Sequence, residues 1–146
     1  MENNKLEILI SDLIGLGPLF KKKLIGNYKL SSTKINHSQF HVLLALKEIG
    51  TCPISEVAKK LSISTPNMTK ILNKLIDENL INRVHDEVDR RIINISLTDD
   101  GNKYLEEEFY NLSDKIREKL LNLDDKQVEE LFESVNNLNK ILSNIE

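Results

Sequence analysis

The chain has 146 residues, enough for one domain with a hydrophobic core, and carries a formal net charge of −3. No apolar run approaches the roughly 20 residues that cross a bilayer, and the N-terminal segment lacks the basic and apolar regions of a secretory signal. We therefore expect a cytoplasmic protein with no membrane partner. The single cysteine, Cys52, excludes an internal disulfide. With three scattered histidines it also makes a poor four-ligand zinc site, so we expect no cofactor and no metal.

The charge is unevenly distributed along the chain. Lys and Arg against Asp and Glu give residues 1–98 a net charge of +4 and residues 99–146 a net charge of −7. This asymmetry is typical of a protein in which one part faces phosphates and another faces solvent or a partner. A solvated acidic helix would produce the same pattern.

The first predicted element is a helix from Leu6 to about Tyr28, where apolar residues recur at spacings of three and four. Gly15, Gly17 and Pro18 interrupt the pattern and predict a kink or an unwound turn. The polar residues 31–36 are expected to form a connection.

Three shorter helices follow. The first runs from about Ser38 to Glu48 and stops at Gly50, and the second runs from about Ser55 to Leu61. The third begins at Ser64 or Thr65, either of which can cap its free N–H groups, and ends near Asn79. Two helices joined by a turn of three to four residues form a helix-turn-helix.

After this pair the apolar period changes from helical to alternating. Residues 81–85 and 93–97 are predicted to be strands, joined by the charged segment 86–91. A hairpin directly behind the second helix of a helix-turn-helix is a wing.

From Thr98, a predicted N-cap, the chain returns to helix with a turn at residues 123–125. The predicted fold is mainly α with a small β-hairpin wing. Residues 36–98 form the winged helix-turn-helix DNA-binding domain, and residues 1–35 and 99–146 form a helical dimerisation region. The terminal helices carry more apolar surface than a lone winged domain would cover, which favours self-association.

The predicted second helix of the pair projects polar side chains away from its apolar face, as a helix that enters the major groove must. Asn67 and Lys70 suit bases, whereas Thr69 and Lys74 suit phosphates. Arg90 and Arg91 on the hairpin suit the narrow minor groove. The candidate DNA-contacting residues are Ser64, Thr65, Pro66, Asn67, Thr69, Lys70, Lys74, Asp89, Arg90 and Arg91. A solvated hairpin in which Asp89 pairs with an arginine is the structural alternative for the tip.

The segment 89–101, with the sequence DRRIINISLTDDG, is similar to the D-R-R-x-x-x-V-x-L-T-x-x-G wing signature of MarR-type (multiple antibiotic resistance regulator) winged-helix transcription factors. Ile95 replaces the signature Val. Residues 54–58 and 64–70 also resemble the family around the turn and at the start of its recognition helix. One departure is that Glu87 and Val88 follow Asp86, where the family often has a proline.

The resemblance implies a homodimer that binds double-stranded DNA at a palindromic operator, most often as a repressor. Its recognition helices would lie about 34 Å apart, one turn of B-DNA. It also implies a small anionic or aromatic effector that binds between the dimerisation helices and the winged domain. The candidate effector-pocket residues are Tyr28, Phe40, His41 and Phe109, each of which also suits an ordinary core position.

The residues fit other functions less well. The chain offers no nucleophile elbow, phosphate-binding glycine loop or metal-ligand cluster, so we expect no enzyme. The alternative is a winged helix that serves as a protein-interaction or scaffold module without DNA binding. His37 and His41 have a spacing that can chelate a metal, but they lack an obvious third ligand. Cys52 is predicted to be an inert packed thiol rather than an oxidant sensor, because nothing near it in sequence would lower its pKa.

Overall fold

The computed structural model describes residues 2–30 and 34–145, which form two compact units. One unit contains Met1–Tyr28 and Leu112–Glu146, and the other contains Lys29–Asn111. Among the described residues, none of the helices combines the length and the apolar character needed to span a membrane.

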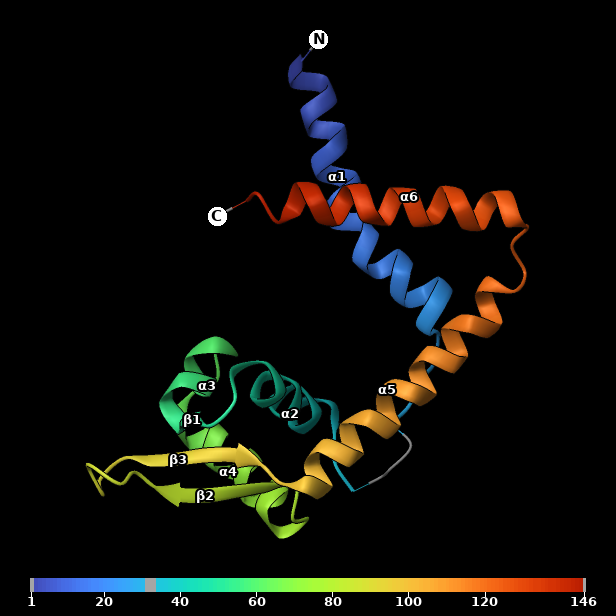
Figure 1. Ribbon diagram of the computed structural model, residues 1–146. Helices are drawn as coiled ribbons and strands as arrows, with labels where there is room; N and C mark the ends of the chain where they lie inside the picture. The colour runs from blue at the N-terminus through green and yellow to red at the C-terminus, as the bar shows by residue number, and fades with distance from the viewer. Residues whose placement is uncertain (1, 31–33, 146) are drawn as a thin grey trace. The chain divides into compact units, whose positions relative to one another are not determined.

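The unit Lys29–Asn111 contains the predicted winged helix-turn-helix (Figure 1). Its complete elements are α2 (His37–Ile49), β1 (Cys52–Pro53), α3 (Ile54–Lys60), α4 (Thr65–Asp77), β2 (Ile81–His85) and β3 (Ile93–Leu97), and it ends within α5 (Asp99–Leu120). The sheet is antiparallel with the order β1-β3-β2. The mainly helical fold with a hairpin is therefore as predicted from the sequence.

Strand β1 was not predicted from the sequence. It consists of two residues, Cys52 and Pro53, which pair with Ile95 and Asn94 of β3. Two residues are too few to produce an alternating pattern, so only the pairing with β3 identifies this strand.

Local interactions and residue types define where α2 begins and ends and where α4 begins. Asn36 caps α2 through a reciprocal pair of hydrogen bonds with Gln39, of 2.8 and 3.0 Å, and Gly50 ends the helix with a φ of 84°. Pro66 lies in the first turn of α4, where a missing N–H costs nothing. The predicted side-chain cap of α4 is not formed: Ser64 occupies the N-cap position without a side-chain bond, and Thr65 is already inside the helix.

The core of this unit lies between the inner faces of the helices and the sheet. Its most deeply buried side chains are Val42, Leu43, Val57, Met68, Leu72, Leu75, Ile81 and Ile95. Because every element of the winged fold contributes to this one cluster, α4 and the hairpin are held on a shared support.

The other unit contains α1 (Glu2–Phe20), a π-helix η1 (Lys21–Ile25), the end of α5 and α6 (Asp125–Leu142). The predicted unwound turn at Gly15–Pro18 is not formed, since α1 continues as an α-helix through Pro18, whereas the kink stays a prediction. The irregular geometry follows at η1, where the Gly26 N–H donates to the Lys21 carbonyl at 2.7 Å. A wider π turn accommodates a helix whose hydrogen-bond ladder Pro18 has already interrupted.

Candidate nucleic-acid interface

Helix α4 divides its residues between the core and the solvent. Met68, Leu72 and Leu75 are buried, whereas all seven candidate residues from Ser64 to Lys74 are exposed. At 100° per residue, Pro66 and Lys70 lie nearly opposite the buried face. The helix therefore presents a polar outer surface that its own core does not use.

The two lysines on this surface differ in their surroundings. Lys74 Nζ lies 2.6 Å from Glu78 Oε1, and Lys34 Nζ lies 3.8 Å from the other carboxylate oxygen of Glu78. The hydrogen bond from Lys74 is the main reason that the pKa of Glu78 is lowered from its usual value. Lys70 forms no hydrogen bond or ion pair within residues 4–30 and 34–145. Its charge is thus available to a ligand.

A contact between α4 and the wing was not foreseen from the sequence. Arg83 on β2 donates from Nη2 to Asn73 Oδ1 at 2.9 Å, and both side chains are exposed. Asn73 lies one turn after Lys70 on the same outer face of α4. Because the two partners belong to different elements, no periodicity in the sequence could have paired them.

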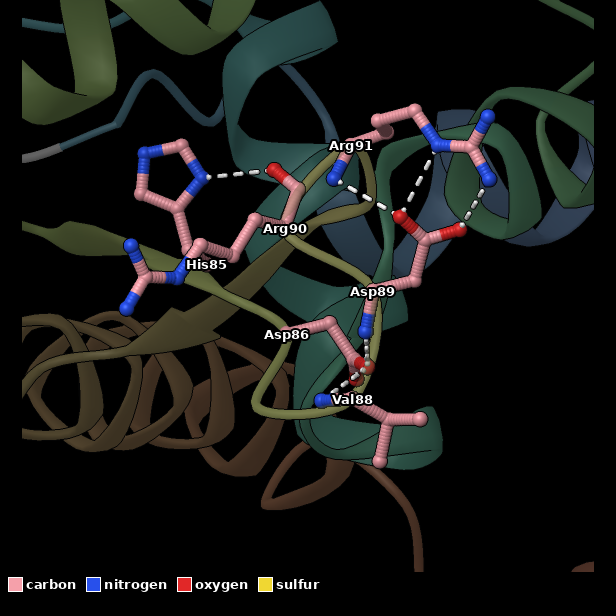
Figure 2. A network of polar contacts seen from close by, with 6 residues as sticks. All are labelled: His85, Asp86, Val88, Asp89, Arg90 and Arg91. Atoms are coloured by element: carbon pink, nitrogen blue, oxygen red, sulfur yellow. Dashed lines mark hydrogen bonds and ion pairs between the residues drawn. The ribbon is translucent and has the colours of Figure 1, made fainter.

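The tip of the wing is a closed loop built around Asp86 (Figure 2). The Asp86 carboxylate accepts hydrogen bonds of 3.0 Å from the N–H groups of both Val88 and Asp89, and one of 3.2 Å from the Asn94 side chain. The N–H groups of Asp89 and Val88, in that order, hold the pKa of Asp86 below its usual value. The backbone of the tip is therefore held by its own side chain, without the proline that the family often has there.

The two tip arginines are not equivalent. Arg91 forms a fork with Asp89, with Nε and Nη2 each 3.1 Å from a carboxylate oxygen, and the Arg91 N–H adds a third bond of 3.0 Å. These bonds, the side-chain ones first, lower the pKa of Asp89. The Arg90 guanidinium has no partner within the described part of the chain and points to the opposite side of the loop (Figure 2). The sequence did not show which arginine Asp89 would orient. In the structure, Asp89 binds Arg91.

The four candidate effector-pocket residues are placed differently. Tyr28 belongs to the unit with the terminal helices, where the Lys115 ammonium lies 5.9 Å from its ring centroid. Phe40 packs against the core of the winged unit, whereas His41 and Phe109 are exposed. A pocket shared by these residues stays a prediction.

Cys52 is buried, and desolvation raises the pKa of its thiol, with a smaller contribution from Glu56. A protonated thiol is a poor nucleophile, in keeping with the prediction of an inert cysteine. Within the described residues no three His, Cys, Asp or Glu side chains gather as metal ligands would.

Helix α3, the turn after it, α4 and the β2–β3 hairpin together define a winged helix-turn-helix protein. Residues 35–93 match the model of the MarR family. The chain is 32% identical over 99 residues to the multiple antibiotic resistance protein MarR of Salmonella typhimurium, a match that covers 64% of this chain and 68% of that protein. The chain therefore belongs to the MarR family, which confirms the resemblance seen in the wing signature.

One further sequence relative and one solved structure are also similar to this chain. The HTH-type transcriptional repressor MdtR of Bacillus subtilis is 36% identical over 103 residues, which cover 68% of this chain and 65% of MdtR, slightly under two thirds of its length. A mutant MarR from E. coli complexed with operator DNA is 26% identical, with a TM-score of 0.57 over 90% of this chain and 94% of that one. The family and these relatives are transcriptional regulators, not enzymes.

Proposed function

We propose that this protein is a cytoplasmic DNA-binding transcription regulator, acting as a repressor, that binds a palindromic operator as a homodimer. The observation that carries the proposal is the outer surface of α4, followed directly by the hairpin. Among the described residues, neither Lys70 on α4 nor the Arg90 guanidinium on the hairpin has a hydrogen-bond or ion-pair partner. A helix of this kind fits the major groove, and an arginine-tipped hairpin fits the adjacent minor groove.

Each candidate residue has a role that suits its position. Asn67 and Lys70 would contact base edges, and Thr65 would contact DNA from the first turn of α4. Ser64, Thr69 and Lys74 would lie against the phosphates, with Lys74 shared between a phosphate and Glu78. Pro66, on the same outer side as Lys70, would contact DNA without a hydrogen bond. Arg90 would enter the minor groove, while Asp89 holds Arg91 at its edge.

The terminal helices support the homodimer. The exposed apolar side chains of α1 run from Leu6 to Phe20 and, at 100° per residue, cover roughly 240° of the helix circumference. A helix that packs on one side needs a stripe of only about 100°. Helix α6 has no buried residue, and its apolar stripe from Val128 to Leu142 is exposed except at the half-buried Leu138. A second copy, packed through residues 1–35 and 99–146, would cover both surfaces.

The names of two similar proteins support the proposed repressor function and operator binding. MdtR is named a transcriptional repressor, and the E. coli MarR mutant was solved with operator DNA. We further propose a small anionic or aromatic effector that releases the DNA, with Tyr28, Phe40, His41 and Phe109 as candidate contacts. A screen of phenolic and anionic compounds for release of bound DNA tests this part.

The experiment that tests the proposal is a gel shift with the promoter region of the protein's own gene, repeated over a series of salt concentrations. We expect saturable binding whose log K falls with log salt by about 0.9 for each phosphate neutralised. A duplex of equal length and scrambled sequence serves as the control and should bind more weakly. Absence of saturable binding at low salt would instead favour the scaffold module without DNA binding.

A further inference from the structure

The apex of the wing carries an apolar side chain that has no role within the chain. Val88 is 96% exposed, the most exposed of the large apolar residues described. Its backbone N–H is held by Asp86, but its isopropyl group points away from the Asp89–Arg91 fork (Figure 2). The turn is therefore closed by Asp86, and the valine side chain adds nothing to it.

Valine is also an unusual choice for this position. Tight turns favour Gly, Pro, Asn, Asp and Ser, whereas β-branched residues are favoured in strands. Departures from local turn chemistry are expected mainly at functional or strained sites. Burial of this side chain against a ligand would be favourable.

The charges of the tip show what kind of contact it needs. Segment 86–91 holds three acidic and two basic residues, so its net charge is −1 although it is the part expected to approach phosphates. Two of the carboxylates, Asp86 and Asp89, are occupied by hydrogen bonds within the loop. Charge alone gives this tip little affinity for DNA, and an apolar contact would add to it.

We propose that Val88 contacts the deoxyribose walls of the DNA minor groove and provides binding that does not depend on charge. Many minor-groove proteins use both arginines and apolar side chains, the latter often inserted between base steps. This inference rests on the proposed DNA-binding function and adds one residue to it. Arg90 supplies the electrostatic part of the contact, and Val88 supplies the apolar part.

The test compares Val88→Thr with the wild type on the promoter fragment over a salt series. Threonine keeps the branched shape and replaces one methyl group by a hydroxyl. We expect about a fivefold weaker Kd at every salt concentration, with an unchanged slope of log K against log salt. Val84→Thr, the same change at the half-exposed Val84 on β2, is the matched control and should change Kd less than twofold.

Three results would overturn the inference while DNA binding itself stands. They are an unchanged Kd for Val88→Thr, a changed salt slope for this variant, and an equal loss for Val84→Thr. If the wild type does not bind DNA, the proposed function is wrong, and the role proposed for Val88 is then wrong as well. A circular dichroism spectrum and melting curve like those of the wild type confirm that the variant is folded.

Discussion

Asp86 and Asp89 lie three residues apart at the tip of the wing and hold different groups. Asp86 binds backbone N–H groups and shapes the loop, whereas Asp89 binds the Arg91 guanidinium through two parallel bonds. Since paired guanidinium and carboxylate groups largely cancel their charge, Arg90 remains as the tip cation available to DNA. Short-range hydrogen bonds within the loop thus determine which arginine is paired and which can contact DNA.

At this scale we predict that Arg90→Ala weakens binding to the promoter fragment and reduces the magnitude of the salt slope by about 1. The reason is the loss of one unpaired cation from the minor groove. The fold and the dimer should be retained, as measured by circular dichroism and light scattering, because the Arg90 side chain forms no hydrogen bond or ion pair within the described residues.

Arg91→Ala is the matched comparison for this prediction. Removing Arg91 frees the Asp89 carboxylate, so any loss of affinity should come without a comparable fall in the slope. Unchanged affinity for Arg90→Ala would remove the wing from the proposed interface.

At the scale of elements, the end of α4 and the start of α5 are joined through Thr98. Its hydroxyl donates to the Asn79 carbonyl at 2.6 Å and accepts from the Gly101 N–H at 2.9 Å, while its own N–H donates to the Leu80 carbonyl at 3.1 Å. The first turn of α5 thereby lies against the turn that follows α4. The threonine and glycine of the wing signature both belong to this junction.

We predict that Gly101→Ala lowers the free energy of unfolding by about 1–3 kcal/mol, measured by urea denaturation. A Cβ at this position would overlap sterically with the Leu80 backbone carbonyl. A backbone group cannot move aside as a side chain could. Backbone displacement at the end of α4 is the expected result.

Gly15→Ala is the control for this prediction. A Cβ at Gly15 would meet nothing within 4 Å, and alanine favours a helix, so we expect unchanged stability or a gain of up to about 1 kcal/mol. Equal losses for the two variants would show that the junction is not the cause.

At the scale of the whole molecule, the two units differ in how much of their apolar surface is covered. The winged unit has a buried cluster, whereas α1 and α6 have no buried side chains among those described. Since burial of apolar area is the main favourable term in folding, the terminal helices need additional cover to be stable. This imbalance is the physical basis of the proposed homodimer.

We predict that the double substitution Leu131→Glu and Val135→Glu converts the protein from a dimer to a monomer, as measured by analytical ultracentrifugation. Both residues lie on the exposed apolar stripe of α6, and two carboxylates there would oppose burial against a second copy. Operator affinity should fall strongly, because one recognition helix would no longer position the other.

Asn137→Glu, on the exposed polar side of α6, is the matched control and should leave the dimer intact. A wild type that is monomeric at all concentrations tested, or a double variant that remains dimeric, would contradict the proposal.

The sequence by itself determined the elements and the family. Helical and alternating periods arise from which side chains must be buried on each element, so they predicted α2 to α6 and the two long strands of the hairpin. The wing signature indicated the MarR family, which the comparisons confirm. These features are readable because they depend on neighbours that are close in the chain.

Tertiary structure decided what depends on pairing between elements. Strand β1 exists only because β3 lies beside it, and Arg83 meets Asn73 only because the hairpin folds back on α4. The choice of Arg91 by Asp89 is different, because the two residues are only two positions apart, but it depends on how the loop is folded and periodicity does not predict it. Periodicity carries no information on such contacts, because they depend on the distance in space between groups and not on their spacing along the chain.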